Sequence, residues 1–503
     1  MKKILNGVFD VFFLFVSILV FVTAFSQMTV QSPISGLFVI VAAIVFAFLC
    51  TKKTDIVEKI GCEKIWWILR IVSLAVMFKF AFSLEVGFSW DWSRLIKSAY
   101  VYGTEGRMDR ADYYARYPNN QFWLICLVSL FKFLKLFIKD ISITFFKHVT
   151  MAVSVVVLQI AIEFIYRSAK IIFSEKKALL AGVMALFCLP FYLYSGFFYT
   201  DTPSILLISI MIFLYLKILN SESKKTQIIL CVLLGFVGAI TYFIKVIAVI
   251  VFVAILIGII LTKITPKQFI CFFLISVATL GLTVKAINVA IEPICQNDFG
   301  ITEEMREKYE FPPTHWIMMG LGYGGYSQED VNYTDSFGTL EEKEEANINE
   351  IKNRLQNYGL SGFLKHTFID KVTRTFANST LAGDDYVSRK AIYPNGIIQK
   401  IFSANGDFHA VEYAYSWTYH IIILLGILLT AIESLKQTPS KQNRQLLACR
   451  IAFFGIFAFM LIWECNSRYI YVFIPVLILL ATDGLSSFAN TVKRISTKKA
   501  KKQ

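Results

Sequence analysis

The run FWLICLVSLFKFLKLFI, residues 122–138, decides how this chain is arranged, because it is apolar enough to be read as a membrane-spanning helix. Its lysines, Lys132 and Lys135, are followed by Lys139 at helical spacing, which places positive charge along one face. If the run crossed a membrane, every later loop would change sides and the basic loops would face outside. We therefore predict that it forms an amphipathic helix lying in the outer membrane interface.

Apolar blocks of about twenty residues surround this run, which is the length that crosses a hydrocarbon core of about 30 Å. Hydrophobic residues make up 56% of the 503 residues and charged residues only 17%, against roughly 25% charged residues in soluble domains. We predict an all-α polytopic membrane protein with about twelve transmembrane helices. The predicted helices are Val8–Phe25, Pro33–Cys50, Ile65–Leu84, Ser142–Tyr166, Ala178–Tyr199, Thr202–Leu219, Gln227–Ile244, Val246–Leu261, Gln268–Val289, Tyr419–Ser434, Leu446–Trp463 and Tyr469–Phe488.

Lysine and arginine are distributed unevenly along the chain. The formal net charge is +14, yet residues 290–419 hold 19 acidic and 11 basic residues, a net charge of −8. The remaining positive charge lies in short loops between apolar blocks and in the tail Lys493–Lys502. This is the positive-inside pattern of membrane proteins, so we expect both termini in the cytoplasm and no nucleic-acid partner.

The resulting topology divides the chain into six parts. Residues 1–84 hold three transmembrane helices, 85–141 form a first large outer segment with interfacial helices, and 142–289 hold six more helices. Residues 290–418 form an extracytoplasmic domain, 419–488 hold the last three helices, and 489–503 are a basic cytoplasmic tail. The outer domain lacks a strong alternating pattern, so we predict mixed but mainly helical structure, with Leu340–Ile369 interrupted at Gly359 and Gly362.

Two acidic residues stand at the predicted outer ends of helices. Asp91 lies in Ser89-Trp90-Asp91-Trp92, where the tryptophans anchor at the interface. A carboxylate held there suits a general base, although a helix-end aspartate paired with Arg94 is the alternative. Asp201 follows Phe198-Tyr199-Thr200 and falls on the same face, and a simple helix N-cap is its alternative role.

Basic residues and a histidine complete the candidates from the residues alone. Lys245 sits in a tight hairpin between two apolar helices, where it either contacts a lipid phosphate or reaches the interface. Arg468 follows Trp463-Glu464-Cys465-Asn466-Ser467 and suits a phosphate, with an ion pair to Glu464 as the alternative. His315, in the aromatic stretch 311–320, either contacts a phosphate or sugar or is a packed structural histidine. No nucleotide-binding or HExxH motif occurs.

Taken together, these motifs resemble the GT-C superfamily of membrane glycosyltransferases, in the branch of protein O-mannosyltransferases and aminoarabinose transferases. The similar features are Trp90-Asp91-Trp92 in the first outer loop, an interfacial helix after Tyr117-Pro118-Asn119-Asn120, Tyr199-Thr200-Asp201-Thr202-Pro203, Thr241-x-x-x-Lys245, and Glu464-x-x-x-Arg468-Tyr469. Their order and shared side of the membrane carry the resemblance, which covers most of Glu85–Phe488. Two extra helices at the start and an outer domain inserted before the last three helices depart from the family pattern.

The resemblance implies a transferase that takes a sugar from a polyprenyl-phosphate carrier and passes it to an acceptor outside the cytoplasm. Asp91 would act as catalytic base or orient the acceptor, and Asp201 would line the same site. Lys245 and Arg468 would hold the carrier phosphate. The resemblance also makes Arg94, Tyr117, Asn119, His315, Glu464 and Tyr469 candidates for substrate binding. It leaves open whether a divalent metal ion is a cofactor.

Two other functions remain open at this stage. A cell-surface polysaccharide polymerase also joins lipid-linked sugars, but the acidic outer domain argues against its arginine-rich loops. A non-enzymatic flippase or transporter of lipid-linked sugars would place polar groups near the bilayer midplane and often shows repeated halves. Here the candidate polar residues cluster at the predicted outer ends of helices and no repeat is visible, but the polar residues Arg70, Lys79, His148 and Glu163 within apolar blocks keep this function open. The expected partners are the lipid-linked donor, the bilayer and an acceptor in the cell envelope (glycan, lipid or protein), and the expected location is the bacterial plasma membrane.

Overall fold

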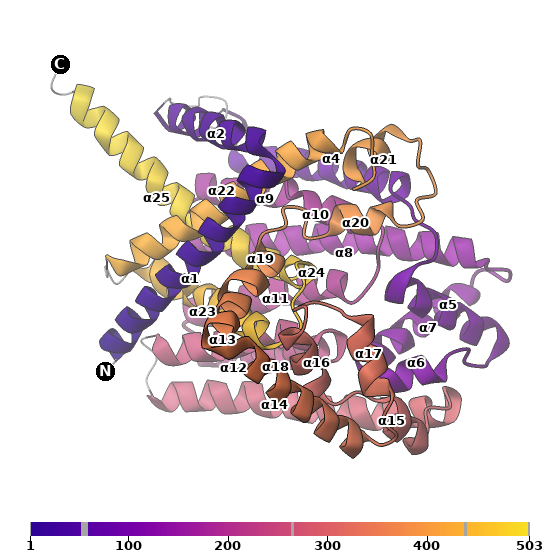
Figure 1. Ribbon diagram of the computed structural model, residues 1–503. Coiled ribbons are helices and arrows are strands. Elements are labelled where there is room, and N and C mark those ends of the chain that lie inside the picture. The colour runs from indigo at the N-terminus through magenta and orange to yellow at the C-terminus, as the bar shows by residue number, and fades with distance from the viewer. Residues whose placement is uncertain (1, 52–58, 263–265, 437–439, 501–503) are drawn as a thin grey trace.

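The computed structural model describes residues 2–51, 59–262, 266–436 and 440–500, which form a bundle of helices (Figure 1). Nine helices in these ranges are long and apolar enough to cross a membrane. They are α1 (Lys2–Gln31), α4 (Cys62–Ser83), α8 (Ile143–Ile172), α11 (Asp201–Asn220), α12 (Lys224–Ile244), α14 (Pro266–Pro293), α22 (His409–Leu435), α23 (Lys441–Ile462) and α25 (Ile474–Ala500).

Shorter helices account for the rest of the apolar sequence. Two of them, α2 (Pro33–Thr51) and α13 (Val249–Leu261), contain apolar stretches shorter than 18 residues. The described residues contain no strand, only one isolated bridge between Val86 and Ala391. The prediction of an all-α polytopic membrane protein is therefore confirmed.

The first two helices pack against the end of the chain. Both α1 and α2 contact α22. Asp10 of α1 accepts from Arg450 of α23 at 2.6 Å, and the two side chains are almost fully buried. Ser35 of α2 donates to the Ala414 carbonyl at 3.2 Å. Because a buried ion pair is strongly destabilising when one partner is removed, the Asp10–Arg450 contact fixes α1 against the last helices.

The predicted helix Ala178–Tyr199 is broken in the structure. It consists of α9 (Glu175–Leu186) and α10 (Leu189–Leu193), and Pro190 lies in the first turn of α10. Proline has no amide hydrogen and cannot continue the ladder of α9. Tyrosine hydroxyls satisfy the freed carbonyls: Tyr192 donates to Leu186 at 2.6 Å, and Tyr415 donates to Phe187 at 2.5 Å.

Three helices cover one end of the bundle, at the right of Figure 1: α5 (Trp90–Glu105), α6 (Ala111–Arg116) and α7 (Gln121–Lys135). The helix α7 contains residues 122–135 of the run quoted first. Its 15 residues reach about 22 Å, too short to cross a bilayer alone. It buries Trp123 and Phe131, whereas its other face exposes Phe133 together with Lys132 and Lys135. An exposed face of this composition is typical of an interfacial helix.

All the regular secondary structure described between α14 and α22 is helical. Its α-helices are α15 (Glu303–Tyr309), α16 (Pro313–Leu321), α17 (Gln328–Asp335), α18 (Leu340–Lys365), α19 (Lys371–Phe376), α20 (Gly383–Ser388) and α21 (Ile397–Phe402). Gly359 has φ +57° and interrupts α18, as its place in the sequence suggested. Short helical turns complete the chain: η1 (Pro118–Asn120), η2 (Val246–Ala248), η3 (Ile294–Asp298), η4 (His366–Asp370) and α24 (Arg468–Tyr471).

This segment is tied to the first outer segment at two places. The amide of Gly87 donates to the Lys390 carbonyl at 2.7 Å, and the amide of Ile392 donates to the Glu85 carbonyl at 2.9 Å. Arg116, at the end of α6, donates to Asp335 of α17 at 2.5 Å. These contacts place residues 85–141 and 290–418 at the same end of the bundle.

Candidate active site

Asp201 joins three parts of the chain through its carboxylate. It is the first residue of α11, where the positive end of the helix dipole favours a negative charge. Lys245, at the end of α12, donates to Oδ1 at 2.7 Å. Arg468, the first residue of α24, places Nε 3.9 Å from Oδ2. The exposed fractions of these side chains are 4% for Asp201, 11% for Lys245 and 12% for Arg468. Two buried cations therefore share one carboxylate.

Local backbone conformation explains the position of Lys245. The helix α12 ends there because Lys245 is extended, with φ −160° and ψ 101°, and the turn η2 follows at once. The extended residue turns its side chain away from the helix axis and toward α11. Its ammonium also lies 5.3 Å from the ring centre of Tyr469, close enough for a cation–π interaction.

Three aromatic rings surround the guanidinium of Arg468. Its carbon lies 5.4 Å from the ring centre of Trp90, 5.6 Å from Tyr199 and 5.2 Å from Tyr386. Nη1 donates to the Tyr386 hydroxyl at 3.0 Å, whereas Nε has no hydrogen-bond partner. The rings hold the cation by its faces, and its buried Nε faces the Asp201 carboxylate 3.9 Å away.

Trp90 is held in a strained conformation at the start of α5. Its φ is +42°, which non-glycine residues rarely adopt and which costs about 1–3 kcal/mol. Ring contacts hold it there, with centres 4.8 Å from Tyr386, 5.2 Å from Tyr199 and 5.5 Å from Phe197. In this conformation the indole lies against Arg468, and Asp91 follows it in the first turn of α5.

Asp91 faces a group of hydroxyl and amide side chains from the first outer segment. Burial, followed by the nearby charge of Asp91, raises the pKa of Tyr113. Asn120, almost fully buried, donates to the Tyr113 hydroxyl at 3.0 Å and accepts from Tyr199 at 3.3 Å. Burial, and then the charge of Asp91, raise the pKa of Tyr117 to about 12. Hydrogen bonds therefore link Tyr113 to Tyr199 through Asn120, and Tyr199 packs against Arg468.

The turn after α23 contributes a second carboxylate. Burial raises the pKa of Glu464, and the Tyr469 hydroxyl donates to it at 2.9 Å. The predicted alternative of a Glu464–Arg468 ion pair is not formed, because Arg468 pairs with Asp201. Lys371 of α19 donates to the carbonyls of Gly320 at 3.0 Å and Trp463 at 2.8 Å, and burial lowers its pKa to about 8.

The other predicted site residues lie around or away from this cluster. Arg94 has its guanidinium 5.4 Å from the Tyr113 ring and no ion pair with Asp91. Tyr117 packs near Tyr113 with ring centres 5.1 Å apart. Asn119 is exposed, unlike its neighbour Asn120. His315 is fully buried within the segment between α14 and α22, where its Nδ1 lies 2.7 Å from the Thr334 hydroxyl.

Several residues of the cluster were absent from the sequence-based candidates. Tyr386, Lys371 and Asn120 contact it from α20, α19 and η1. Asn120 stands in a quoted motif, but nothing in the sequence separated it from Asn119. Neither Tyr386 nor Lys371 belongs to a sequence motif. Folding of the chain brings Tyr386 to Arg468 and Lys371 to the turn at Trp463.

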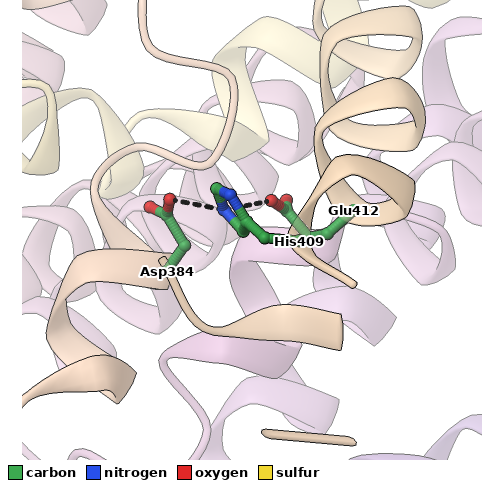
Figure 2. Close-up of side chains that lie close together, drawn as sticks. All are labelled: Asp384, His409 and Glu412. Atoms are coloured by element: carbon green, nitrogen blue, oxygen red, sulfur yellow. Dashed lines mark hydrogen bonds and ion pairs between the residues drawn. The ribbon is translucent and has the colours of Figure 1, made fainter. Parts of the chain in front are cut away.

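Among the residues that the structure describes, one group could hold a metal ion. It consists of Asp384, His409 and Glu412 (Figure 2). Neither Asp91 nor Asp201 belongs to it.

Comparison with known proteins identifies a family and distant structural neighbours. A family model described as conserved hypothetical integral membrane protein matches residues 1–487. No curated protein sequence matches the chain. The archaeal oligosaccharyltransferase AglB from Archaeoglobus fulgidus, solved with an inhibitory peptide and a dolichol-phosphate, is 14% identical with a TM-score of 0.45, covering 84% of this chain and 50% of AglB.

A second structure of the Archaeoglobus fulgidus oligosaccharyltransferase, tethered to an acceptor peptide, is also 14% identical. Its TM-score is 0.43, with 85% of this chain and 50% of that one covered. The chain thus spans about half the length of the solved structures that it matches.

Proposed function

We propose that this chain, which belongs to the family of conserved hypothetical integral membrane proteins, is a glycosyltransferase of the GT-C type. It moves a sugar from a polyprenyl-phosphate donor to a cell-envelope acceptor at the non-cytoplasmic face of the membrane. The proposed location is the bacterial plasma membrane, with both termini in the cytoplasm.

One observation carries the proposal: Lys245 and Arg468 converge on the single carboxylate of Asp201 at the ends of membrane-spanning helices. Lys245, Arg468 and Asp201 together carry a net charge of +1, and two cations at one place attract an added anion; the buried carboxyl of Glu464 also acts on both cations. A lipid phosphate entering at this end of the bundle would meet that charge at the depth of its headgroup.

The proposed reaction uses Asp91 on the acceptor side. The acceptor hydroxyl attacks the anomeric carbon, its proton passes to Asp91, and the bond from that carbon to the phosphate oxygen breaks. The phosphate leaves with the bonding electrons, and Lys245 and Arg468 stabilise its negative charge. Asp201 keeps the two cations together, and the rings of Trp90, Tyr199 and Tyr386 form apolar walls for the sugar.

The other candidates support this arrangement. Glu464 accepts from Tyr469, whose ring lies against Lys245, so this pair positions the lysine. Arg94 and Tyr117 pack around Tyr113, which faces Asp91. We assign these four residues to substrate positioning. Asn119 and His315 lie outside the cluster and are not needed for it.

The test is sugar transfer in proteoliposomes from a polyprenyl-phosphate sugar to an envelope extract. Cells with and without the protein identify the sugar and acceptor by their glycan difference. We expect Asp91→Asn and Arg468→Ala to reduce transfer by about 10²–10³-fold or more, with normal expression and membrane insertion. The exposed pairs Arg110–Asp112 and Arg107–Glu105 supply the matched controls Asp112→Asn and Arg107→Ala. Full activity of Asp91→Asn would remove the catalytic assignment.

A flippase or transporter of lipid-linked sugars is the second candidate, because ionised residues lie within the spanning helices. Arg70 of α4 donates to Glu163 of α8 at 2.7 Å, and His148 of α8 lies 2.9 Å from Glu85. These groups are paired with each other and so do not line a path for a solute. Movement of lipid-linked sugar between leaflets without any transfer would favour this second function.

A further inference from the structure

Three metal-ligating side chains meet at the junction of α20 and α22, beside the candidate active site. Asp384 comes from α20, and His409 and Glu412 come from the first turn of α22 (Figure 2). Nε2 of His409 lies 3.1 Å from an oxygen of Asp384 and 3.1 Å from an oxygen of Glu412. One possible ligand atom from each residue lies within 4.8 Å of the other two.

Both carboxylates approach the same nitrogen of His409. An imidazole nitrogen carries at most one hydrogen, so it donates a well-aligned hydrogen bond to one of them at a time. Around a divalent ion with bonds of about 2.0–2.2 Å, adjacent ligand atoms lie about 3 Å apart. The two distances from His409 Nε2, 3.1 Å each, are therefore close to those between adjacent ligands of one metal ion.

The state of Glu412 is a second, independent observation. Its side chain has no exposed area, and its carboxylate shares the single Nε2 of His409 with Asp384, without a well-aligned hydrogen bond of its own. A fully buried carboxylate that shares its partner in this way is only partly compensated. Asp384 is oriented by the Thr380 hydroxyl, which donates to it at 2.5 Å. Hydrogen bonding to a ligand carboxylate of this kind is typical of metal sites.

We propose that Asp384, His409 and Glu412 bind one divalent transition-metal ion. One imidazole and two carboxylates are ligands of Zn²⁺ and Mn²⁺. The ion links α20 to α22 and neutralises the buried carboxylates. Glu412 also lies at the wall of a cavity of about 480 Å³ whose other walls include Val72, Phe80 and Tyr415.

The site also bears on the proposed function, on which this part of the inference rests. The helix α20 carries Asp384 and, two residues later, Tyr386, whose hydroxyl accepts from Arg468. A metal that fixes α20 therefore positions Tyr386 against the proposed phosphate-binding cation. The metal has a positioning role, because its ligands lie outside the cluster around Asp201.

Metal content tests the site directly in full-length protein purified in detergent. After incubation with Mn²⁺ or Zn²⁺ and removal of the excess, we expect roughly one equivalent by mass spectrometry, and an altered Mn²⁺ electron paramagnetic resonance spectrum. Glu412→Gln and Asp384→Asn should each reduce bound metal at least tenfold. Asp385→Asn is the matched control, since Asp385 is exposed and pairs with Arg389.

The outcomes separate this inference from the proposed function. Wild-type protein that retains no metal, or variants that retain as much as wild type, would overturn the metal site. Arg468→Ala should lose sugar transfer and keep the metal. Asp384→Asn should lose both the bound metal and most of the sugar transfer. Wild-type protein that binds metal but transfers no sugar would support the metal site and contradict the proposed function.

Discussion

At the scale of single residues, the charge balance around Asp201 determines whether the cluster is stable. Its carboxylate is the only one within ion-pair distance of Lys245 and Arg468 among the described residues. Removing it leaves two buried cations close together. Removing Lys245 instead leaves Asp201 with Arg468 as a partner. The two substitutions are therefore not equivalent.

We predict that Asp201→Asn destabilises the protein by about 3–5 kcal/mol, because it leaves buried cations unpaired. Lys245→Met should destabilise the protein less than Asp201→Asn does. The double variant should be destabilised by less than the sum of the two single effects. Thermal unfolding of the purified protein in detergent measures all three. Strictly additive effects would show that the Asp201–Lys245 contact does not couple the two residues.

The neighbours Asn119 and Asn120 give a second prediction at this scale. Asn120→Ala removes the amide that links Tyr113 to Tyr199, so we expect sugar transfer to fall about tenfold or more, in line with the loss of one or two hydrogen bonds. Asn119→Ala should have little effect, because Asn119 is exposed. The same transfer assay measures both. A larger loss in Asn119→Ala would place substrate on the exposed side of this turn.

Part of the candidate site could be predicted from the sequence, for a physical reason. Asp201, Lys245 and Arg468 stand at the ends of strongly apolar helices, and the predicted topology places these three ends at one face of the membrane. Tyr386 could not be predicted in this way, because its place depends on the packing of α20 and on no local pattern. The positive φ of Trp90 is also set by ring contacts with residues distant in sequence.

At the scale of helices, close packing of α22 on α25 depends on glycine. A Cβ on Gly484 of α25 would lie 2.0 Å from the Gly426 carbonyl oxygen of α22. Helices in membranes often approach through such small residues. The backbone itself blocks a side chain here, so neither helix can accommodate one by rotamer changes.

We therefore predict that Gly484→Leu lowers the thermal midpoint by at least about 5 °C, since overpacking costs 1–3 kcal/mol or more. Gly281→Leu in α14 is the control, because a Cβ there has no atom within 4 Å. Fluorescence-detected thermal unfolding in one detergent compares the two. Equal midpoints would mean that α22 and α25 separate at no cost.

The outer helices α16 and α17 give a prediction on pH. Burial lowers the pKa of His315 to about 4, below the value of about 6.5 in an unfolded chain. The unfolded state binds the proton first, so stability is full above pH 6.5 and falls as the pH drops toward 4, by at most about 3 kcal/mol. Thermal midpoints between pH 7.5 and 4.5 should fall less steeply in His315→Gln. Identical slopes would exclude this histidine as a source of the pH dependence.

Helix boundaries show where sequence patterns are informative. Hydropathy locates the long spans because length and apolarity are both required to cross a bilayer. It missed the break between α9 and α10, where Pro190 interrupts an otherwise apolar run and tyrosine hydroxyls satisfy the carbonyls. Those hydroxyls come from Tyr192 and from Tyr415 of α22, and the second of these contacts is not visible in local sequence.

At the scale of the whole molecule, three distant segments build the candidate site. Trp90 belongs to the first outer segment, Tyr386 to the second, and Arg468 to the turn after α23 (Figure 1 shows α5, α20 and α24). The ties between Arg116 and Asp335 and between Gly87 and Lys390 bring both outer segments to one end of the bundle. The side of the membrane on which this end lies therefore decides which substrates can reach it.

We predict that this end faces away from the cytoplasm, because the basic loops lie at the other end. Single cysteines report the side in a background in which the nine native cysteines are replaced by serine. Leu340→Cys, at the start of α18, should react with a membrane-impermeant maleimide in intact cells. Glu222→Cys, exposed between α11 and α12, should react only after permeabilisation. The reverse pattern would place Asp91 and Arg468 in the cytoplasm, where a nucleotide-linked sugar and not a lipid-linked donor on the outer leaflet would have to supply the reaction.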